Sequence, residues 1–142
     1  MKKLLAMFLL AFVLILSACG GGELAEDKKI EEKVNEIVKE FSKTKAKQVR
    51  VHEDVDIGEG YKVVIELSLG EKKESKIVKE TLEKFTSDLS VKTAETEGIN
   101  EIKVIYEVPH LVEDDIIANG TIRRENGKMI IEDEWFDREV FD

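Results

Sequence analysis

Residues 116–137 read IIANGTIRRENGKMIIEDEWFD, and this stretch contains the clearest fold signal of the chain. Asn126-Gly127 joins a segment from Ile116 to Arg124 to one from Lys128 to Asp137, and Asn-Gly between apolar-alternating segments is the strongest short-range signal for a β-hairpin. A two-residue loop fixes the register, which pairs Glu125 with Lys128, Ile122 with Ile131, Gly120 with Asp133, and Ala118 with Trp135. This register predicts that Asp133 shares a face with Ile131 and Trp135.

The chain before this hairpin alternates between helical and extended patterns. Apolar residues recur at helical spacing from Glu26 to about Lys45, and again from Glu71 to Leu89. The period is two from Val49 to Ile57, in the clean Tyr61–Leu69 segment, and from Ile102 to Val108, where Pro109 marks the strand end. Gly58-Glu59-Gly60 forms a turn between the first two strands. The sequence therefore predicts an α+β fold, with one antiparallel sheet of about five strands and two amphipathic helices in the order α-β-β-α-β-β-β.

A second set of apolar residues lies on the strand face opposite the Tyr61–Leu69 stripe. Its members are Val64, Ile105, Ile117, Ile130 and Phe136. A simple two-layer domain would leave that face polar. Either the first helix covers these residues, which we take as the expected arrangement, or they form a docking face for a protein partner.

The first residues have the three parts of an export signal. Lys2 and Lys3 precede an unbroken apolar segment from Leu4 to Leu16, and the small residues Ser17-Ala18 follow it. The apolar segment is thirteen residues long, whereas a membrane-spanning helix needs about 20. We therefore expect a signal peptide that is removed.

Leu16-Ser17-Ala18-Cys19 resembles the lipobox of bacterial lipoproteins, and Cys19 is the single cysteine of the chain. The resemblance implies that the Cys19 sulfur receives a diacylglyceryl group and that cleavage occurs just before it. It also implies an anchor of two or three acyl chains, which binds membranes stably where one chain does not. The expected organisation is a signal peptide over 1–18, a lipidated cysteine and flexible tether over 19–25, and one α+β domain over 26–142.

The charge of the chain limits its partners. It has 22 basic and 31 acidic residues, a net charge of −9, and loss of Lys2 and Lys3 with the signal makes this −11. Such a surface disfavours nucleic acid and is repelled by anionic lipid headgroups. We expect a domain that stands off the outer leaflet of the membrane on its tether.

Residues that could support chemistry are few. His52 and His110, the two histidines, lie in no metal-binding or catalytic motif, and the acidic runs lack the spacing of a calcium loop. No cofactor is expected. An ionised Asp133 on an apolar face would be costly if buried, so it lies either at an open end of the sheet or in a polar site. The sequence therefore predicts a non-enzymatic binding or accessory domain; the alternative is a small NTF2-like enzyme or ligand-pocket protein that uses Asp133 and His110.

Overall fold

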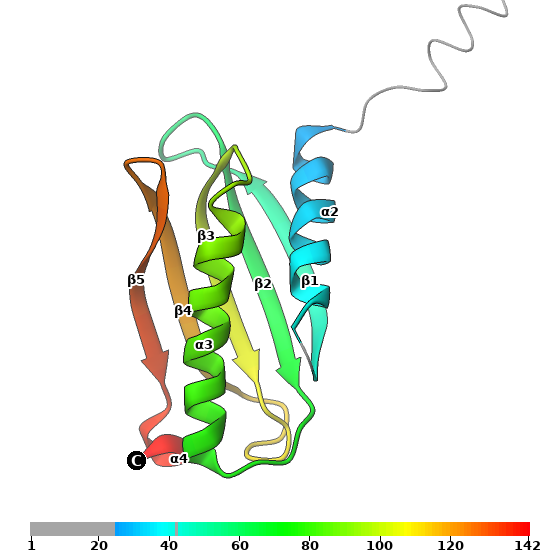
Figure 1. The fold of residues 1–142 in the computed structure, drawn as a ribbon, viewed down its shortest axis with the longest axis vertical. Coiled ribbons are helices and arrows are strands. Elements are labelled where there is room, and N and C mark those ends of the chain that lie inside the picture. Colours follow the sequence, from blue (N-terminus) through cyan, green and yellow to red (C-terminus); the bar gives the residue numbers. More distant parts are fainter. Residues whose placement is uncertain (1–24, 42) are drawn as a thin grey trace, which may run out of the picture.

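The computed structural model describes residues 25–41 and 43–142. Their elements are α2 (Glu26–Lys39), β1 (Thr44–Glu53), β2 (Tyr61–Leu69), α3 (Ser75–Thr93), β3 (Ile99–Glu107), β4 (Ile116–Glu125), β5 (Lys128–Phe136) and α4 (Arg138–Phe141). Figure 1 shows a five-stranded sheet with α2 and α3 side by side on one face. The predicted α+β class and element order are confirmed, with the short α4 added at the end of the chain. None of the described helices has both the length and the apolar character needed to cross a membrane.

The sheet is mixed, so the prediction of a fully antiparallel sheet was wrong. The strand order is β1-β2-β3-β4-β5, and every neighbouring pair is antiparallel except β2 and β3, which run parallel. The cause is the helix between these two strands. Parallel neighbours need a crossover connection, and α3 returns the chain to the end of the sheet where β2 began.

Both long helices contribute to one core, between the helices and one face of the sheet. Val34 of α2, Leu82 of α3 and Ile65 of β2 are fully buried in the same cluster. Phe41, just after α2, stacks on Phe85 of α3 with ring centroids 5.1 Å apart. The expectation that the first helix covers the second face of the sheet was therefore wrong, and no described helix covers that face (Figure 1).

Helix α3 packs tightly against β4 at Gly120. A Cβ atom at this position would lie 2.9 Å from Cγ2 of Thr86, which is tighter than van der Waals contact allows. The Thr86 hydroxyl contacts the Tyr106 hydroxyl at 2.9 Å and also donates to the carbonyl oxygen of Leu82. Burial raises the pKa of Tyr106, partly offset by Thr86, so its hydroxyl keeps its proton. Because position 120 has no side chain, α3 can pack against β4 while the hydroxyl groups of Thr86 and Tyr106 keep their hydrogen bonds.

The hairpin of β4 and β5 has the predicted turn. Asn126 and Gly127 have φ values of 49° and 78°, as a type I′ turn requires. The register is as predicted for Glu125 with Lys128 and for Ile122 with Ile131, but a β-bulge follows at Glu132. Beyond it, Asp133 pairs with Thr121, Glu134 with Gly120, Trp135 with Asn119, and Phe136 with Ala118. The partners predicted for Asp133 and for Trp135, Gly120 and Ala118, were therefore wrong. One extra residue in a strand moves the side chains of all the residues that follow it to the other face of the sheet.

The bounds of three elements also differ from the predictions. The first helix ends at Lys39, and the chain turns through Lys43, with φ of 66°, into a strand that begins at Thr44. That strand ends at Glu53, so Val55 and Ile57 lie exposed in the following turn. The second helix is displaced toward the C-terminus of the chain and runs from Ser75 to Thr93.

Candidate functional site

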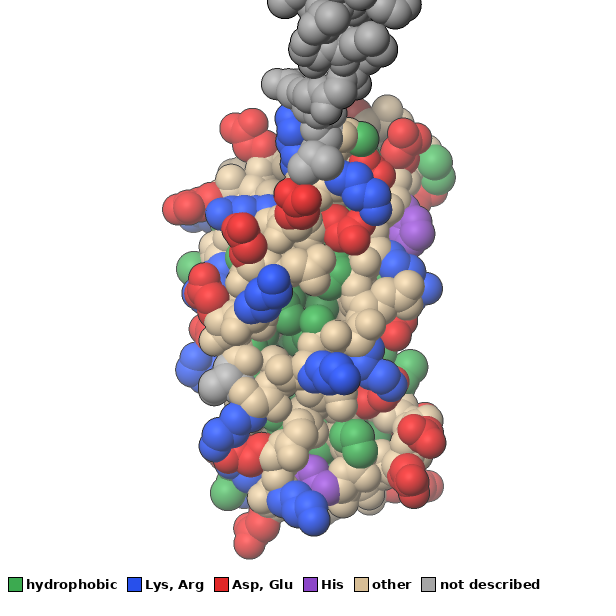
Figure 2. Space-filling model, turned by 90° about the vertical axis from the view of Figure 1, so that its right-hand side faces the viewer, with side chains coloured by type: hydrophobic (Ala, Val, Ile, Leu, Met, Phe, Trp, Pro, Cys, Tyr) green, Lys and Arg blue, Asp and Glu red, His purple; other side chains and the backbone are tan. Residues whose placement is uncertain are grey.

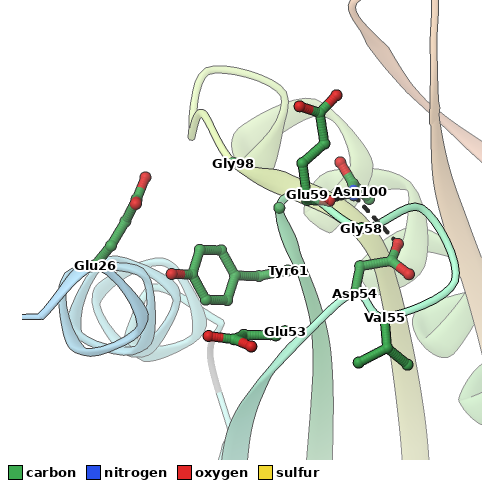
Figure 3. A pocket seen from close by; sticks show the side chains of 10 residues that line it. Glu26, Glu53, Asp54, Val55, Gly58, Glu59, Tyr61, Gly98 and Asn100 are labelled. Atoms are coloured by element: carbon green, nitrogen blue, oxygen red, sulfur yellow. Dashed lines mark hydrogen bonds between the residues drawn. The ribbon is translucent and has the colours of Figure 1, made fainter.

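A cavity with a volume of about 680 Å³ lies at the end of the β1–β2 hairpin. Figure 3 shows Tyr61 at its centre, with its hydroxyl directed between the carboxylates of Glu26 and Glu53. Burial, followed by the negative charges of Glu26, Asp27 and Glu53, raises the pKa of Tyr61. The Tyr61 hydroxyl therefore stays protonated and can act as a hydrogen-bond donor at neutral pH.

Asp54 and Asn100 close the other side of this cavity and hold the hairpin turn. Asp54 is 2% exposed, and its carboxylate accepts hydrogen bonds from the Asn100 amide at 3.1 Å and from the backbone amides of Asp56 and Ile57. The Asn100 amide also donates to the carbonyl oxygen of Glu59 at 2.7 Å. Burial opposes ionisation of Asp54, but these hydrogen bonds and the nearby charge of Lys62 outweigh it and lower its pKa. The oxygens of Asp54 are thus used in the turn itself.

The acidic lining of this cavity does not form a metal site. Within residues 25–41 and 43–142, no group of three or more His, Cys, Asp or Glu side chains is arranged to hold a metal ion. The most buried carboxylate, Asp54, is bonded within the turn. The lining therefore forms an acidic end of the domain whose turn is held by hydrogen bonds.

The face of the sheet opposite the helices is a second candidate surface. Much of it is covered by ion pairs between neighbouring strands. Arg50 of β1 pairs with Glu66 of β2 at 2.7 Å, and Arg123 of β4 bridges Glu101 of β3 and Glu132 of β5 at 2.8 Å each. Lys47 of β1 reaches across β2 to pair with Glu107 of β3. These ion pairs occupy the charged side chains of Arg50, Glu66, Lys47, Glu107, Arg123, Glu101 and Glu132.

One part of this face differs, and we call it the Trp135 surface. It consists of two neighbouring rows across three strands: Lys103, Thr121 and Asp133 in one row, and Ile105, Asn119 and Trp135 in the next. Trp135 is 43% exposed. None of the six side chains makes a hydrogen bond or ion pair to another described residue. The Trp135 surface therefore combines an exposed indole with unused hydrogen-bonding groups.

The edge of the sheet at β1 is less suited to binding. Figure 2 views the molecule from the side of α2 and β1 and shows hydrophobic side chains between interspersed charged ones. Val49 and Val51 are half-buried there and pack against the core. Strand β1 carries Lys45 and Lys47 and has a bulge between Ala46 and Gln48. Lysines and bulges on an edge strand oppose the addition of a further strand.

The predicted docking face is only partly present. Val64 and Ile105 lie half-buried on the uncovered face, and Ile130 lies there 45% exposed. Ile117 and Phe136 do not belong to it, because bulges in β4 and β5 displace them from the expected register. Ile117 is fully buried in the core, and Phe136 packs against the core with Lys79 over its ring.

The two candidates for a polar site, Asp133 and His110, lie in different parts of the fold. Asp133 is exposed on the uncovered face of β5, and Glu134 takes the helix-side position expected for it. Burial and the nearby Glu83 raise the pKa of Glu134. His110 lies in the β3–β4 connection, where its Nε2 is 2.9 Å from the carbonyl oxygen of Lys73. His52 is exposed on β1, and Cys19 lies outside the described residues.

Sequence reasoning missed Asn119, Thr121 and Tyr61 as site residues. Side chains alternate along β4, so the sequence pattern could have placed Asn119 and Thr121 on the face of the sheet away from that of Ala118 and Gly120. Their position next to Trp135 depends on the bulge in β5, so the sequence pattern could not have predicted it.

Comparison with protein families, with curated proteins and with solved structures finds no match to this chain.

Proposed function

We propose that this chain is a lipid-anchored protein of the extracytoplasmic side of a bacterial cell membrane, whose α+β domain binds a ligand through the uncovered face of its sheet. The observation that supports the binding role best is the Trp135 surface. Its indole is partly exposed beside polar groups that have no partner within the described residues, and tryptophan is enriched at binding interfaces. The proposed anchor rests on the lipobox resemblance at Leu16-Ser17-Ala18-Cys19.

The charge distribution agrees with a domain that is tethered to the bilayer without lying on it. The described domain begins beside the acidic cavity, where Glu26, Asp27, Glu53 and Glu59 surround the start of α2 and the β1–β2 turn. Anionic headgroups repel such an end. The uncovered face of the sheet then remains accessible to molecules outside the membrane.

The NTF2-like enzyme is the weaker proposal. It needs a polar pocket with a carboxylate or a histidine, for which Asp133 and His110 are the candidates. Asp133 lies on the uncovered face of the sheet, and His110 lies in the β3–β4 connection. The helix side of the sheet, where such a pocket would open, is filled by the core. A binding role requires neither residue to act in catalysis.

The anchor is tested by labelling cells with a fatty acid. Wild-type protein should incorporate the label and be processed, whereas Cys19→Ala should remain an unlabelled precursor because both steps need the sulfur. A Cys19→Ala variant that is processed at the wild-type rate would refute the anchor.

The binding face is tested by photo-crosslinking in intact cells. A photo-reactive phenylalanine analogue replaces Trp135, and the control carries it at Val91, which is 70% exposed on α3. We expect a defined adduct, of protein or polysaccharide, from position 135 only. Equal labelling from both positions would show that the sheet face has no special role.

A further inference from the structure

We infer that the Trp135 surface binds a neutral, β-linked oligosaccharide whose sugar ring stacks on the indole of Trp135. This inference rests on the proposed function, because it assigns a ligand class to the same uncovered face. It follows from the shape, charge, bonding state and size of the six side chains that form the surface.

The shape favours a flat ligand. Trp135 stands on a sheet face that no described helix covers, with Ile105 and Asn119 beside it in one cross-strand row. Its residue is 43% exposed, so more than half of it is covered by the domain and the rest is presented to solvent. A β-linked gluco-configured sugar has its hydroxyl groups at the ring equator and C–H groups on both faces. Such a face complements the negative face of an aromatic ring.

The bonding state favours a ligand with many hydroxyl groups. Around the indole lie the Asn119 amide, the Thr121 hydroxyl and the Asp133 carboxylate, which together offer donors and acceptors. On the same sheet face, Arg50 and Arg123 have carboxylate partners within 2.8 Å. In the Trp135 surface the corresponding side chains have no described partner. A saccharide can satisfy all of these groups at once through its equatorial hydroxyls.

The charge favours a neutral ligand. The surface has one cationic side chain, Lys103, and one anionic side chain, Asp133, which share a cross-strand row with Thr121 between them. Its formal charge is therefore balanced, although the chain as a whole has a net charge of −9. A strongly basic or acidic ligand would find no matching field at this place.

The size favours a small ligand over a protein. Three strands by two residues span roughly 10 Å by 7 Å at ordinary strand spacings, which matches one or two sugar rings. A stable protein interface buries about 800 Å² on each partner. The ion-paired residues that border the Trp135 surface, such as Glu107 and Arg123, limit its extension.

The test is a fluorescence titration of the full-length lipidated protein in a detergent without a sugar headgroup. Trp135 is the single tryptophan of the chain, so its emission reports on this surface alone. The probes are β-1,4-linked tetramers of glucose and of N-acetylglucosamine, and sorbitol is the control because it has hydroxyls but no ring face. We expect saturable changes with at least one tetramer and none with sorbitol.

Variants assign the change to the surface. Asn119→Ala and Asp133→Ala keep the fluorophore and should each weaken binding by about tenfold, which corresponds to about 1.4 kcal/mol. The matched control is Ile130→Ala, because Ile130 is similarly exposed on the same strand but outside the Trp135 surface. This control should bind as wild type does.

Two results would overturn the inference. One is the absence of a saturable change with either tetramer, and the other is an equal change with sorbitol. If the tetramers fail but a protein crosslinks specifically from position 135, the saccharide assignment is wrong and the proposed binding face stands. If neither occurs, both proposals fail.

Discussion

Replacement of Gly120 by alanine tests the packing that leaves one face of the sheet free. The added Cβ would lie 2.9 Å from Cγ2 of Thr86, 3.3 Å from its hydroxyl oxygen and 3.4 Å from Cγ1 of Val104. Thr86 is 1% exposed, and its hydroxyl is bonded to both Leu82 and Tyr106. Thr86 therefore cannot move away without breaking the contact that satisfies the buried Tyr106 hydroxyl.

The expected change in the free energy of unfolding is the balance of destabilising and stabilising contributions. Overpacking costs about 1–3 kcal/mol, and an unsatisfied buried hydroxyl costs about 1–3 kcal/mol. Alanine in a strand interior is better than glycine by about 0.5–1 kcal/mol, and a buried methyl group adds about 0.8 kcal/mol. We expect Gly120→Ala to lower the free energy of unfolding by about 1–3 kcal/mol.

The assay is equilibrium unfolding in urea, with two further variants. Thr86→Ser removes the clashing methyl group and keeps the hydroxyl, so Gly120→Ala should cost less than half as much in that background. The control is Gly70→Ala, because a Cβ there meets only ordinary van der Waals contact at 3.9 Å. The close packing of α3 against β4 would be contradicted by either of two results. One is a Gly120→Ala variant as stable as wild type, and the other is an equal loss of stability from Gly120→Ala in the wild-type and Thr86→Ser backgrounds.

Three further predictions concern the hairpins and the two faces of the sheet. Gly127→Val should lower the free energy of unfolding by about 1–3 kcal/mol, because valine strains at the observed φ of 78°; an unchanged thermal midpoint would argue against the type I′ turn. Ile130→Lys should change stability by no more than about 0.5 kcal/mol, whereas Ile131→Lys, one residue along but packed against the core, should cost several-fold more; similar urea midpoints for the two would contradict the assigned faces. The pKa of Asp54 is lowered in the folded state, so its contribution to stability is present above the unfolded pKa of about 4 and is lost as the pH falls through the folded value. Asp54→Asn should therefore reduce stability at pH 7 more than at pH 2, and an equal loss at both pH values would show that the ionised carboxylate does not hold the turn.

The order of the elements and most of the core were predictable because each strand and helix has a regular apolar period. Val63, Ile65, Leu67 and Leu69 alternate without interruption and are all buried. The parallel pairing of β2 and β3 could also have been predicted, since a helix lies between them. The position of α2 follows from size: five strands span roughly 19 Å, a helix is about 10–12 Å wide, and two helices side by side are needed to cover one face.

The candidate site was less predictable because it depends on strand irregularities. The bulge at Glu132 moves Trp135 and Asp133 to the uncovered face, and no local pattern in the sequence distinguishes Glu132 from its acidic neighbours. A similar irregularity in β4 buries Ile117 instead of exposing it. Single extra residues of this kind are set by the packing of neighbouring strands, so the apolar period alone cannot place them.

The central claim is that the Trp135 surface is used for binding and is not required for the domain to fold. Trp135→Ala tests it most directly when stability and binding are measured on the same preparation, by urea unfolding and by calorimetric titration with the β-1,4-linked tetramers. We predict that the variant still unfolds cooperatively, with a free energy of unfolding about 1–3 kcal/mol below wild type because the half-covered indole loses its contacts with the sheet, and that its binding is weakened at least about tenfold. A variant that does not fold, or one that binds as tightly as wild type, would contradict the claim.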